Sequence, residues 1–312
     1  MEANKRYRRV CRLVDQLSPH GRRTKQQFSD AVIVKVYFWS THNDRPVFWA
    51  CEHESNWPEA LLLDIVGGTL PSQPTMSRRL RTVGVLGVIE RVQTKLADVL
   101  ADNVVKTIDS KPLRVGSYSK DRDARRGRAA GEMARGYKLH AVTSGKSVQL
   151  WTLTAMNTSD QVGAATLLPK LGGAGGAGGA GGAGGWGYVT ADNGYDANPM
   201  HRLTRAINHQ LVAPPRRSNA HVRDTRRNLP ERIRSLDICA NPLRHCGIGD
   251  STFARSLVKQ REQIERNFGN AAMMGMFAPP PWVRTPHRVA AWTAAKLIQR
   301  MMRQVEIAGV SV

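Results

Sequence analysis

The order of β-like and helical segments between residues 104 and 213 most constrains the fold of this chain. β-like runs lie at residues 104–108, 137–142, 147–154, 188–191 and 210–213, and helical patterns lie at 160–171 and 198–207. Gly145-Lys146 separates two of the strand patterns as in a β-hairpin, and Asp160 is a suitable N-cap for the first helix. Hairpin strands followed by alternating helices and strands predict an α/β layer on a mixed sheet.

A Gly-Gly-Ala repeat at residues 172–185 interrupts this pattern between a helix and the next strand. Glycine loses more backbone entropy on ordering than any other residue, and alanine offers little surface to bury. We therefore expect a mobile surface loop here. A phosphate-cradling loop is the weaker interpretation, because no Lys-Ser or Lys-Thr pair follows the repeat.

Helical patterns dominate both ends of the chain. Three apolar side chains share one face of a predicted helix at 253–276: Leu257, Ile264 and Phe268. Residues 1–100 carry few strand signals and many aromatic and basic residues, so we expect them to be mostly helical. The sequence therefore predicts a helical region at 1–100 and an α/β domain at 101–312.

One short segment of the helical region has the pattern of a DNA-reading helix. Ser72 is a suitable N-cap, and Pro74 is tolerated in the first turn. The expected apolar face is Met76, Leu80 and Val83, the outward face is Ser77, Arg78, Arg81 and Thr82, and the expected helix end is Gly84. Serine and arginine on a short capped helix suit a helix-turn-helix element in a DNA major groove. An ordinary basic surface helix has the same pattern, so both interpretations stay open.

The chain carries a large positive charge. It has 46 Lys and Arg against 25 Asp and Glu, a formal net charge of +21. The excess lies in basic patches at residues 5–25, 114–138, 216–234 and 284–303. Self-repulsion on this scale favours a polyanionic partner, and nucleic acid is the first expectation. A membrane surface is the weaker alternative, because no patch lies on a helix with a large aromatic face.

The remaining composition favours a cytoplasmic protein. No uncharged apolar run approaches the roughly 20 residues needed to span a bilayer. No signal peptide is expected, because no apolar stretch follows the charges of Met1 to Arg6. The cysteines are too few and too scattered for a disulfide scaffold: Cys11, Cys51, Cys239 and Cys246.

Three acidic residues stand where metal-dependent phosphodiester chemistry needs them. Such chemistry commonly uses two divalent ions, and Mg²⁺ takes oxygen ligands from acids on rigid elements. We expect Asp109 and Asp192 at the ends of two strands and Glu265 on a helix. Taken singly, each acid is also typical of a turn or a cap, so the hypothesis requires that all three meet in the fold.

Four segments around these acids carry a resemblance to a known family. They are Ile108-Asp109-Ser110-Lys111, Gly136-Tyr137-Lys138-Leu139-His140, Ala191-Asp192-Asn193-Gly194-Tyr195-Asp196, and Arg261 through Glu265 to Phe268-Gly269. In this order the sequence resembles the bacterial insertion-sequence transposases of the DDE class over roughly residues 25–305. The resemblance implies a ribonuclease-H-like mixed sheet flanked by helices, preceded by a mostly helical DNA-binding region.

The resemblance also implies an activity and a site. The family's three carboxylates correspond to Asp109, Asp192 and Glu265, which would hold two Mg²⁺ ions, with Mn²⁺ as a substitute. The implied enzyme binds the terminal inverted repeats of an insertion sequence in double-stranded DNA. It hydrolyses phosphodiester bonds at the ends and transfers the 3′-OH to target DNA. Pairing of two DNA ends implies a homodimer on DNA, and the implied setting is the bacterial cytoplasm at the nucleoid.

Three basic residues near the carboxylates are further candidates for DNA contacts. Arg261 precedes Glu265 by one helical turn, where it could hold a phosphate or orient the carboxylate. Lys138 and His140 share a strand near Asp109. For these two, a structural strand lysine and a core histidine are equally good interpretations.

The sequence also leaves a non-catalytic alternative open. Part of the family has tyrosine where this chain has Val258 and lysine where it has Ala272, and the glycine repeat at 172–185 has the character of an insertion. A regulator that only binds DNA, or a decayed transposase that folds without activity, is therefore the second hypothesis.

Overall fold

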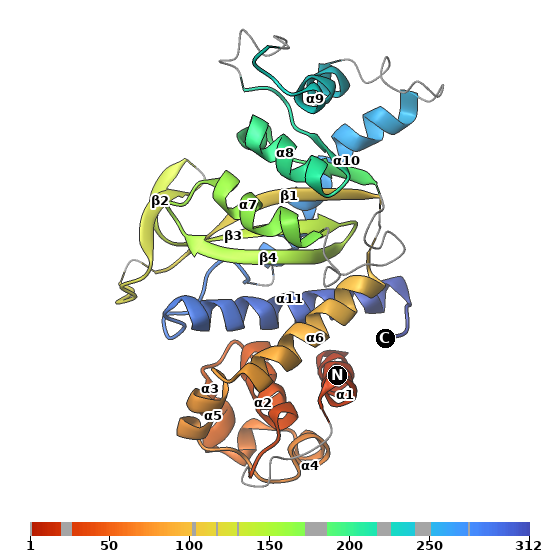
Figure 1. The fold of residues 1–312 in the computed structure, drawn as a ribbon. Coiled ribbons are helices and arrows are strands. Elements are labelled where there is room, and N and C mark those ends of the chain that lie inside the picture. Colours follow the sequence, from red (N-terminus) through yellow and green to blue (C-terminus); the bar gives the residue numbers. More distant parts are fainter. Residues whose placement is uncertain are drawn as a thin grey trace. The chain divides into compact units, whose positions relative to one another are not determined.

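The computed structural model describes residues 2–19, 27–101, 104–116, 118–129, 131–171, 186–216, 226–240, 251–273 and 275–312 (Figure 1). The loop predicted at 172–185 lies outside these residues. The chain divides into two compact units. The helical unit comprises Met1–Val99, Gly116–Arg122 and Ala278–Val312, and the sheet unit comprises Leu100–Val115 and Asp123–Phe277. No helix in the described ranges is long and apolar enough to cross a membrane.

Helices build the described part of the helical unit. They are α1 (Glu2–Leu17), α2 (Asp30–His42), α3 (Val47–Glu52), the 3-10 helix η1 (Glu54–Asn56), α4 (Glu59–Val66), α5 (Gln73–Arg79), α6 (Val83–Val99) and α11 (Pro286–Ala308). α2 lies at the centre, in contact with α1, α3, α6 and α11. Its residues from Ile33 to Thr41 are buried because the helix is apolar on nearly every side.

The last helix packs in the helical unit. α11 contacts α6, α2 and α1, and buries Trp292, Leu297 and Met301 among others. The compact sheet unit thus ends at Phe277, whereas the sequence suggested one domain over 101–312. An apolar helix face does not reveal which distant helices it covers, so sequence patterns alone could not assign α11.

The segment from Ser72 to Gly84 forms two helices. Ser72 caps α5 as predicted, because its Oγ accepts the N–H of Thr75 at 3.4 Å. α5 ends at Arg79, whose guanidinium lies 2.5 Å from the Asp30 carboxylate. Gly84 lies in the first turn of α6, where a Cβ would collide with Asp30. The prediction that Gly84 ends the helix was therefore wrong, because the chain turns earlier, where the N–H and the hydroxyl of Thr82 donate to Arg79 O at 3.0 Å and 2.8 Å.

A six-stranded mixed sheet forms the centre of the described part of the sheet unit. Its strands are β1 (Val105–Arg114), β2 (Arg125–Ala129), β3 (Glu132–Ser144), β4 (Ser147–Ala155), β5 (Gly187–Thr190) and β6 (His209–Val212). β1, β3 and β4 pair antiparallel, and β5 and β6 extend the sheet parallel to β1. β2 pairs with the first part of β3. Gly145, at φ +53°, forms the predicted hairpin turn between β3 and β4.

β1 is longer than the sequence predicts. The expectation that it ends at Asp109 was wrong, because antiparallel pairing with β3 continues through Pro112 to Arg114. Its parallel pairing with β5 stops at Thr107. Pro112 lacks a backbone N–H and is tolerated because β1 no longer pairs with β5 at that point. Asp109 therefore lies inside β1, two residues beyond the last pair with β5, where β1 is still paired with β3 but no longer with β5.

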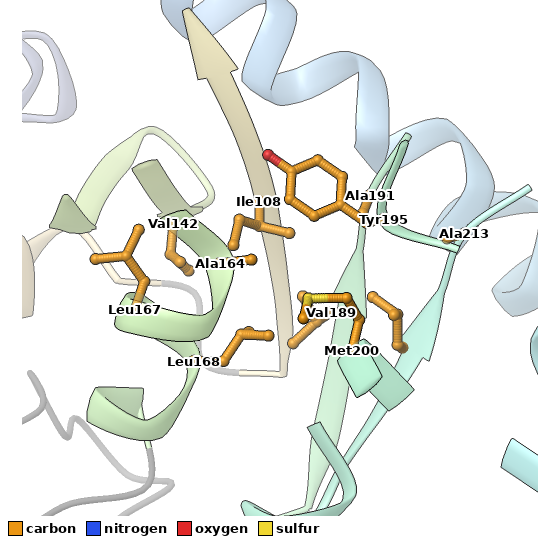
Figure 2. Close-up of a cluster of buried hydrophobic side chains, with 11 residues drawn as sticks. Ile108, Val142, Ala164, Leu167, Leu168, Val189, Ala191, Tyr195, Met200 and Ala213 are labelled. Atoms are coloured by element: carbon orange, nitrogen blue, oxygen red, sulfur yellow. The ribbon is translucent and has the colours of Figure 1, made fainter. Parts of the chain in front are cut away.

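Helices flank the sheet. They are α7 (Asp160–Leu171), the 3-10 helix η2 (Asn193–Tyr195), α8 (Asn198–Ala206), α9 (Pro230–Ala240) and α10 (Ser251–Met273). Figure 2 shows the core in which Ile108 and Val142 of the sheet meet Leu167 of α7 and Met200 of α8, with Tyr195 beside them. α10 packs against β1 and β5. The strand order, the pairing directions and the flanking helices confirm the expected ribonuclease-H-like fold.

Candidate active site

Asp109 lies on the face of β1 that is turned toward α10. Side chains alternate along a strand, and the next residue, Ser110, faces α7, because its hydroxyl donates to Asp160 Oδ1 at 2.6 Å. Asp109 and Lys111 therefore share the opposite face. There the Lys111 ammonium lies 5.9 Å from the centre of the Phe268 ring on α10.

The register between β1 and β5 brings Asp192 level with Asp109. The last pair of this parallel ladder is Thr107 with Thr190, whose hydroxyl oxygens are 2.9 Å apart. Asp109 and Asp192 each stand two residues further on, so both lie on the same face as the threonines. Asp192 also caps η2, since its Oδ1 accepts the N–H of Gly194 at 2.8 Å. Two acids far apart in sequence thus meet at one end of the sheet.

The carboxylates of Asp109 and Asp192 are partly buried, and the charge of Asp192 acts on Asp109. Burial raises the pKa of Asp109 to about 7, and the negative charge of Asp192 adds to this rise. Burial also raises the pKa of Asp192; the charge of Asp160 adds to the rise, while Arg261 and Arg216 oppose it. A bound cation would favour the ionised form of both acids and so offset this rise in pKa.

Glu265 lies on α10, the helix that packs against β1 and β5. Its side chain is 64% exposed, and its Oε1 lies 4.0 Å from Nη2 of Arg261 one turn earlier. Arg261 is near enough to Asp192 to oppose the rise of its pKa. The structure therefore brings Asp109 and Asp192 together, and it places Glu265 on the neighbouring helix with its carboxylate near Arg261.

The donor set fits a divalent cation through the two aspartates. Carboxylate oxygens are the ligands that Mg²⁺ and Mn²⁺ prefer. One oxygen of Asp109 and one of Asp192 accept backbone N–H groups, from Ser110 and Gly194, which orients each carboxylate. Within the described residues, no group of three or more His, Cys, Asp and Glu side chains is already arranged to hold a metal. Two of the three predicted ligands are thus close together, and the third is not in place.

The comparison with protein families identifies the sheet unit. A family model described as the transposase DDE domain matches residues 101–278, more than half of the 312 residues. The chain belongs to the DDE transposase family. The matched range contains Asp109, Asp192 and Glu265, and this family generally uses divalent metals. No curated protein and no solved structure gives a significant match to the chain.

Lys138 of the transposase is held in place by an ion pair with Asp160. Its Nζ donates to Thr158 O at 2.8 Å and to Asp160 Oδ1 at 3.0 Å. Its side chain is 14% exposed. These contacts are those of a strand lysine in an ion pair, and its partner Asp160 also raises the pKa values of the two aspartates.

His140 lies in the core of the transposase. Its side chain has no exposed surface, and its Nε2 lies 2.9 Å from Thr154 Oγ1. α7 passes so close to the ring that a Cβ at Gly163 would collide with it. Burial lowers the pKa of His140 to about 4, so the ring is neutral at neutral pH. These surroundings favour the core-histidine interpretation over a contact with DNA.

The predicted DNA-reading residues lie on the surface of the helical unit. Ser77 is half-buried on α5, Arg78 is exposed, and Arg81 is exposed in the turn after the helix. Met76 is fully buried, as the predicted apolar face requires, but Val83 is 88% exposed. The prediction for Val83 was wrong because α5 ends before it and the chain changes direction.

Asp160 is an acid of the site that sequence reasoning missed. We expected it only as the N-cap of α7. In the fold its carboxylate accepts from Ser110 and Lys138, and its charge raises the pKa of both Asp109 and Asp192. An acid at a helix start is a common signal, so only the fold reveals that this helix begins beside the paired aspartates.

Proposed function

We propose that this transposase is a catalytically active, metal-dependent DNA endonuclease and strand transferase that moves an insertion sequence. It binds the terminal inverted repeats of the element in double-stranded DNA. Hydrolysis adds water across a P–O bond at each end and leaves a 3′-OH. That 3′-OH attacks a phosphodiester of target DNA, forms a new P–O bond and displaces a 3′-OH of the target strand. The observation that carries the proposal is the nearness of Asp109 and Asp192, each two residues beyond the paired Thr107 and Thr190.

The acidic residues would hold the metal ions of this reaction. Asp109 and Asp192 would bind two divalent ions, Mg²⁺ in the cell with Mn²⁺ as a substitute. Glu265 would complete the ligand set by turning from Arg261 toward them. When bound, the ions supply charge neutralisation at the phosphate and a water of lowered pKa. Asp109 is fixed by a paired strand and Asp192 by its cap on η2, so both carboxylates are oriented before the metal arrives.

Basic residues would position the DNA around these acids. Arg261, once Glu265 has turned away, presents a planar donor pair suited to a phosphate. Lys138 would lie near the scissile phosphate, and Ser77, Arg78 and Arg81 would contact DNA from the helical unit. Because two element ends must be brought together, the transposase would act as a homodimer on DNA. We expect it to work in the bacterial cytoplasm at the nucleoid.

A nicking assay on the element's own ends tests the proposal. The substrate is a duplex carrying the inverted repeats that bracket the reading frame. The parent chain should nick it with Mg²⁺ or Mn²⁺ and not with EDTA. Asp192→Asn should abolish nicking and leave DNA binding nearly unchanged, while Asp98→Asn, at an exposed acid of α6, should cut like the parent. If Asp192→Asn cuts as fast as the parent, the catalytic assignment is wrong.

A DNA-binding protein without chemistry is the second candidate. The observation that favours it is the exposed position of Glu265 near Arg261 rather than beside the two aspartates. A regulator or decayed transposase would bind end DNA equally well with and without metal. It would nick no substrate under any metal condition, so the same assay separates the two candidates.

A further inference from the structure

The helical unit contains an apolar cavity that the proposed reaction does not use. Its volume is about 210 Å³, and its wall is drawn from α2, α3, α5 and the turn after it, the segment that leads into α11, and the first turns of α11. The side chains that determine its chemistry are Phe48, Gln73, Ser77, Arg81, Trp282 and Arg288. Two of them, Ser77 and Arg81, are residues that the sequence already marks as candidates for DNA contact.

Two aromatic rings in the wall are accessible. Phe48 on α3 is 47% exposed, and Trp282 before α11 is 43% exposed. Trp282 lies in a turn closed by the N–H of Val283 donating to Pro280 O at 2.9 Å, so its backbone is fixed. Soluble proteins usually bury such rings, and exposed ones beside a cavity mark a binding surface.

Cations border the cavity without acids to balance them. Arg81 and Arg288 are exposed, and neither forms an ion pair with another described residue. No Asp or Glu belongs to the wall as far as the structure describes it. The nearby acid Asp44 already pairs with Lys296 at 2.5 Å. Arg81 and Arg288 therefore favour an anionic ligand, and the net charge of +21 on the whole chain adds to this preference.

Polar groups on α5 and the size of the cavity limit further which anionic ligands it could bind. Gln73 and Ser77 stand one turn apart and offer an amide and a hydroxyl, which can both donate and accept hydrogen bonds. The volume of about 210 Å³ is below the roughly 300–1,000 Å³ of sites for drug-sized ligands, so it suits one ring system. A planar ring with polar edges and a neighbouring negative charge matches the aromatic wall and its size, the polar groups of α5, and the two arginines.

We propose that this cavity binds one unstacked base of DNA, with the adjoining phosphate held by Arg81 or Arg288. The base would stack on Trp282 or Phe48 and present its edge to α5. Bases inside a duplex are already stacked, so the ligand is an unpaired base at a frayed, nicked or single-stranded end. An apolar peptide would leave both arginines without partners. The inference rests on the proposed binding of DNA, but it does not depend on the carboxylates.

Binding of two matched DNA duplexes by the full chain in EDTA tests this inference. One duplex is blunt, and the other carries a short single-stranded extension containing 2-aminopurine, whose fluorescence falls on stacking. The parent should bind the extended duplex about tenfold more tightly or better, the equivalent of one base–aromatic stack, and quench the probe. Trp282→Leu should lose this preference and the quenching while keeping the parent's affinity for the blunt duplex. Trp186→Leu, at a 72% exposed tryptophan of the sheet unit, should retain both.

The outcomes separate this inference from the proposed function. Equal binding of blunt and extended duplexes by the parent overturns the inference alone. So does a Trp282→Leu variant that still prefers the extended duplex, or one whose main change is in oligomeric state, which would assign the cavity to a second copy. Failure of the parent to bind either duplex overturns both the inference and the proposed binding of DNA.

Discussion

Arg232 holds Asp196 in a two-point ion pair. Its Nε lies 2.8 Å from Oδ1 of Asp196, and its Nη2 lies 2.9 Å from Oδ2. Although burial opposes ionisation of this acid, its interactions with His201 and Arg232 hold the pKa of Asp196 below the usual value. Asp196 follows Asp192 by four residues, so the ion pair anchors the segment that carries Asp192 to α9.

Arg232→Met should strongly destabilise the protein. It leaves the buried Asp196 carboxylate without its partner, which costs about 3–5 kcal/mol of unfolding free energy. Because the pKa of Asp196 is lowered in the folded state, the pair stabilises the fold above the usual pKa of aspartate. This contribution is lost as the pH falls through the folded-state pKa. Urea denaturation should therefore give a lower unfolding free energy for Arg232→Met than for the parent at neutral pH, and the difference should become smaller in acid. A variant as stable as the parent at neutral pH would contradict this role, and adding Asp196→Asn should restore part of the loss.

Asp109→Asn should stabilise the metal-free protein at a pH above 7. The pKa of Asp109 rises from 3.8 to about 7 on folding, chiefly through burial, so the folded state favours the protonated acid. Stability is lost as the pH rises through this range, because the unfolded acid ionises first. At about 1.4 kcal/mol per pKa unit, the asparagine variant should gain a few kcal/mol above pH 7 and little near pH 4. Thermal unfolding in EDTA checks this, and a gain that does not grow with pH would contradict it.

Glu265→Gln should reduce end nicking far more than Glu262→Gln. Both glutamates lie on α10, but Glu262 pairs with Arg266 at 3.2 Å on an exposed surface, and such pairs contribute little. Loss of an outer partner of a metal ligand commonly costs 10- to 100-fold, so loss of a direct ligand should cost about 100-fold or more. Nicking rates at saturating Mg²⁺ provide the measurement. Equal rates for the two variants would remove Glu265 from the site.

Gly163→Ala should destabilise α7 against the sheet, although alanine is the better helix former. A Cβ at position 163 would collide with the buried ring of His140, and overpacking of this kind costs about 1–3 kcal/mol. His140→Ala should relieve the collision, so the double variant should lose less stability than the sum of the two single changes. If the losses simply add, the two residues do not pack as the structure indicates. DNA affinity should be unchanged in all of these variants, because His140 is not exposed.

Local sequence signals predicted the elements that local chemistry determines. The turn at Gly145-Lys146 joins β3 and β4 as expected, and α7 has the predicted bounds from Asp160 to Leu171. Ser72 caps α5 because a serine before a helix satisfies a free backbone N–H. Each of these features depends on a few neighbouring residues, which a single sequence contains.

Features that depend on distant partners escaped prediction. β2 is rich in arginine and has no strand alternation, so only its pairing with β3 defines it. β1 continues past Asp109 because β3 extends beside it, and Arg79 at the end of α5 pairs with the distant Asp30. Of the candidate site, the meeting of Asp109 and Asp192 could be anticipated from parallel strands. The nearness of Asp160 and the orientation of Glu265 toward Arg261 could not, since each is set by how helices pack on the sheet.

Titration with Mn²⁺ tests the central claim most directly, namely that Asp109 and Asp192 form one metal site. Calorimetry on the parent should show binding with release of protons at neutral pH, because the pKa of Asp109 is about 7 without metal. Asp109→Asn and Asp192→Asn should each lose this binding, and Asp98→Asn should keep it. If both asparagine variants at 109 and 192 bind Mn²⁺ as the parent does, the two aspartates are not the metal site and the account fails.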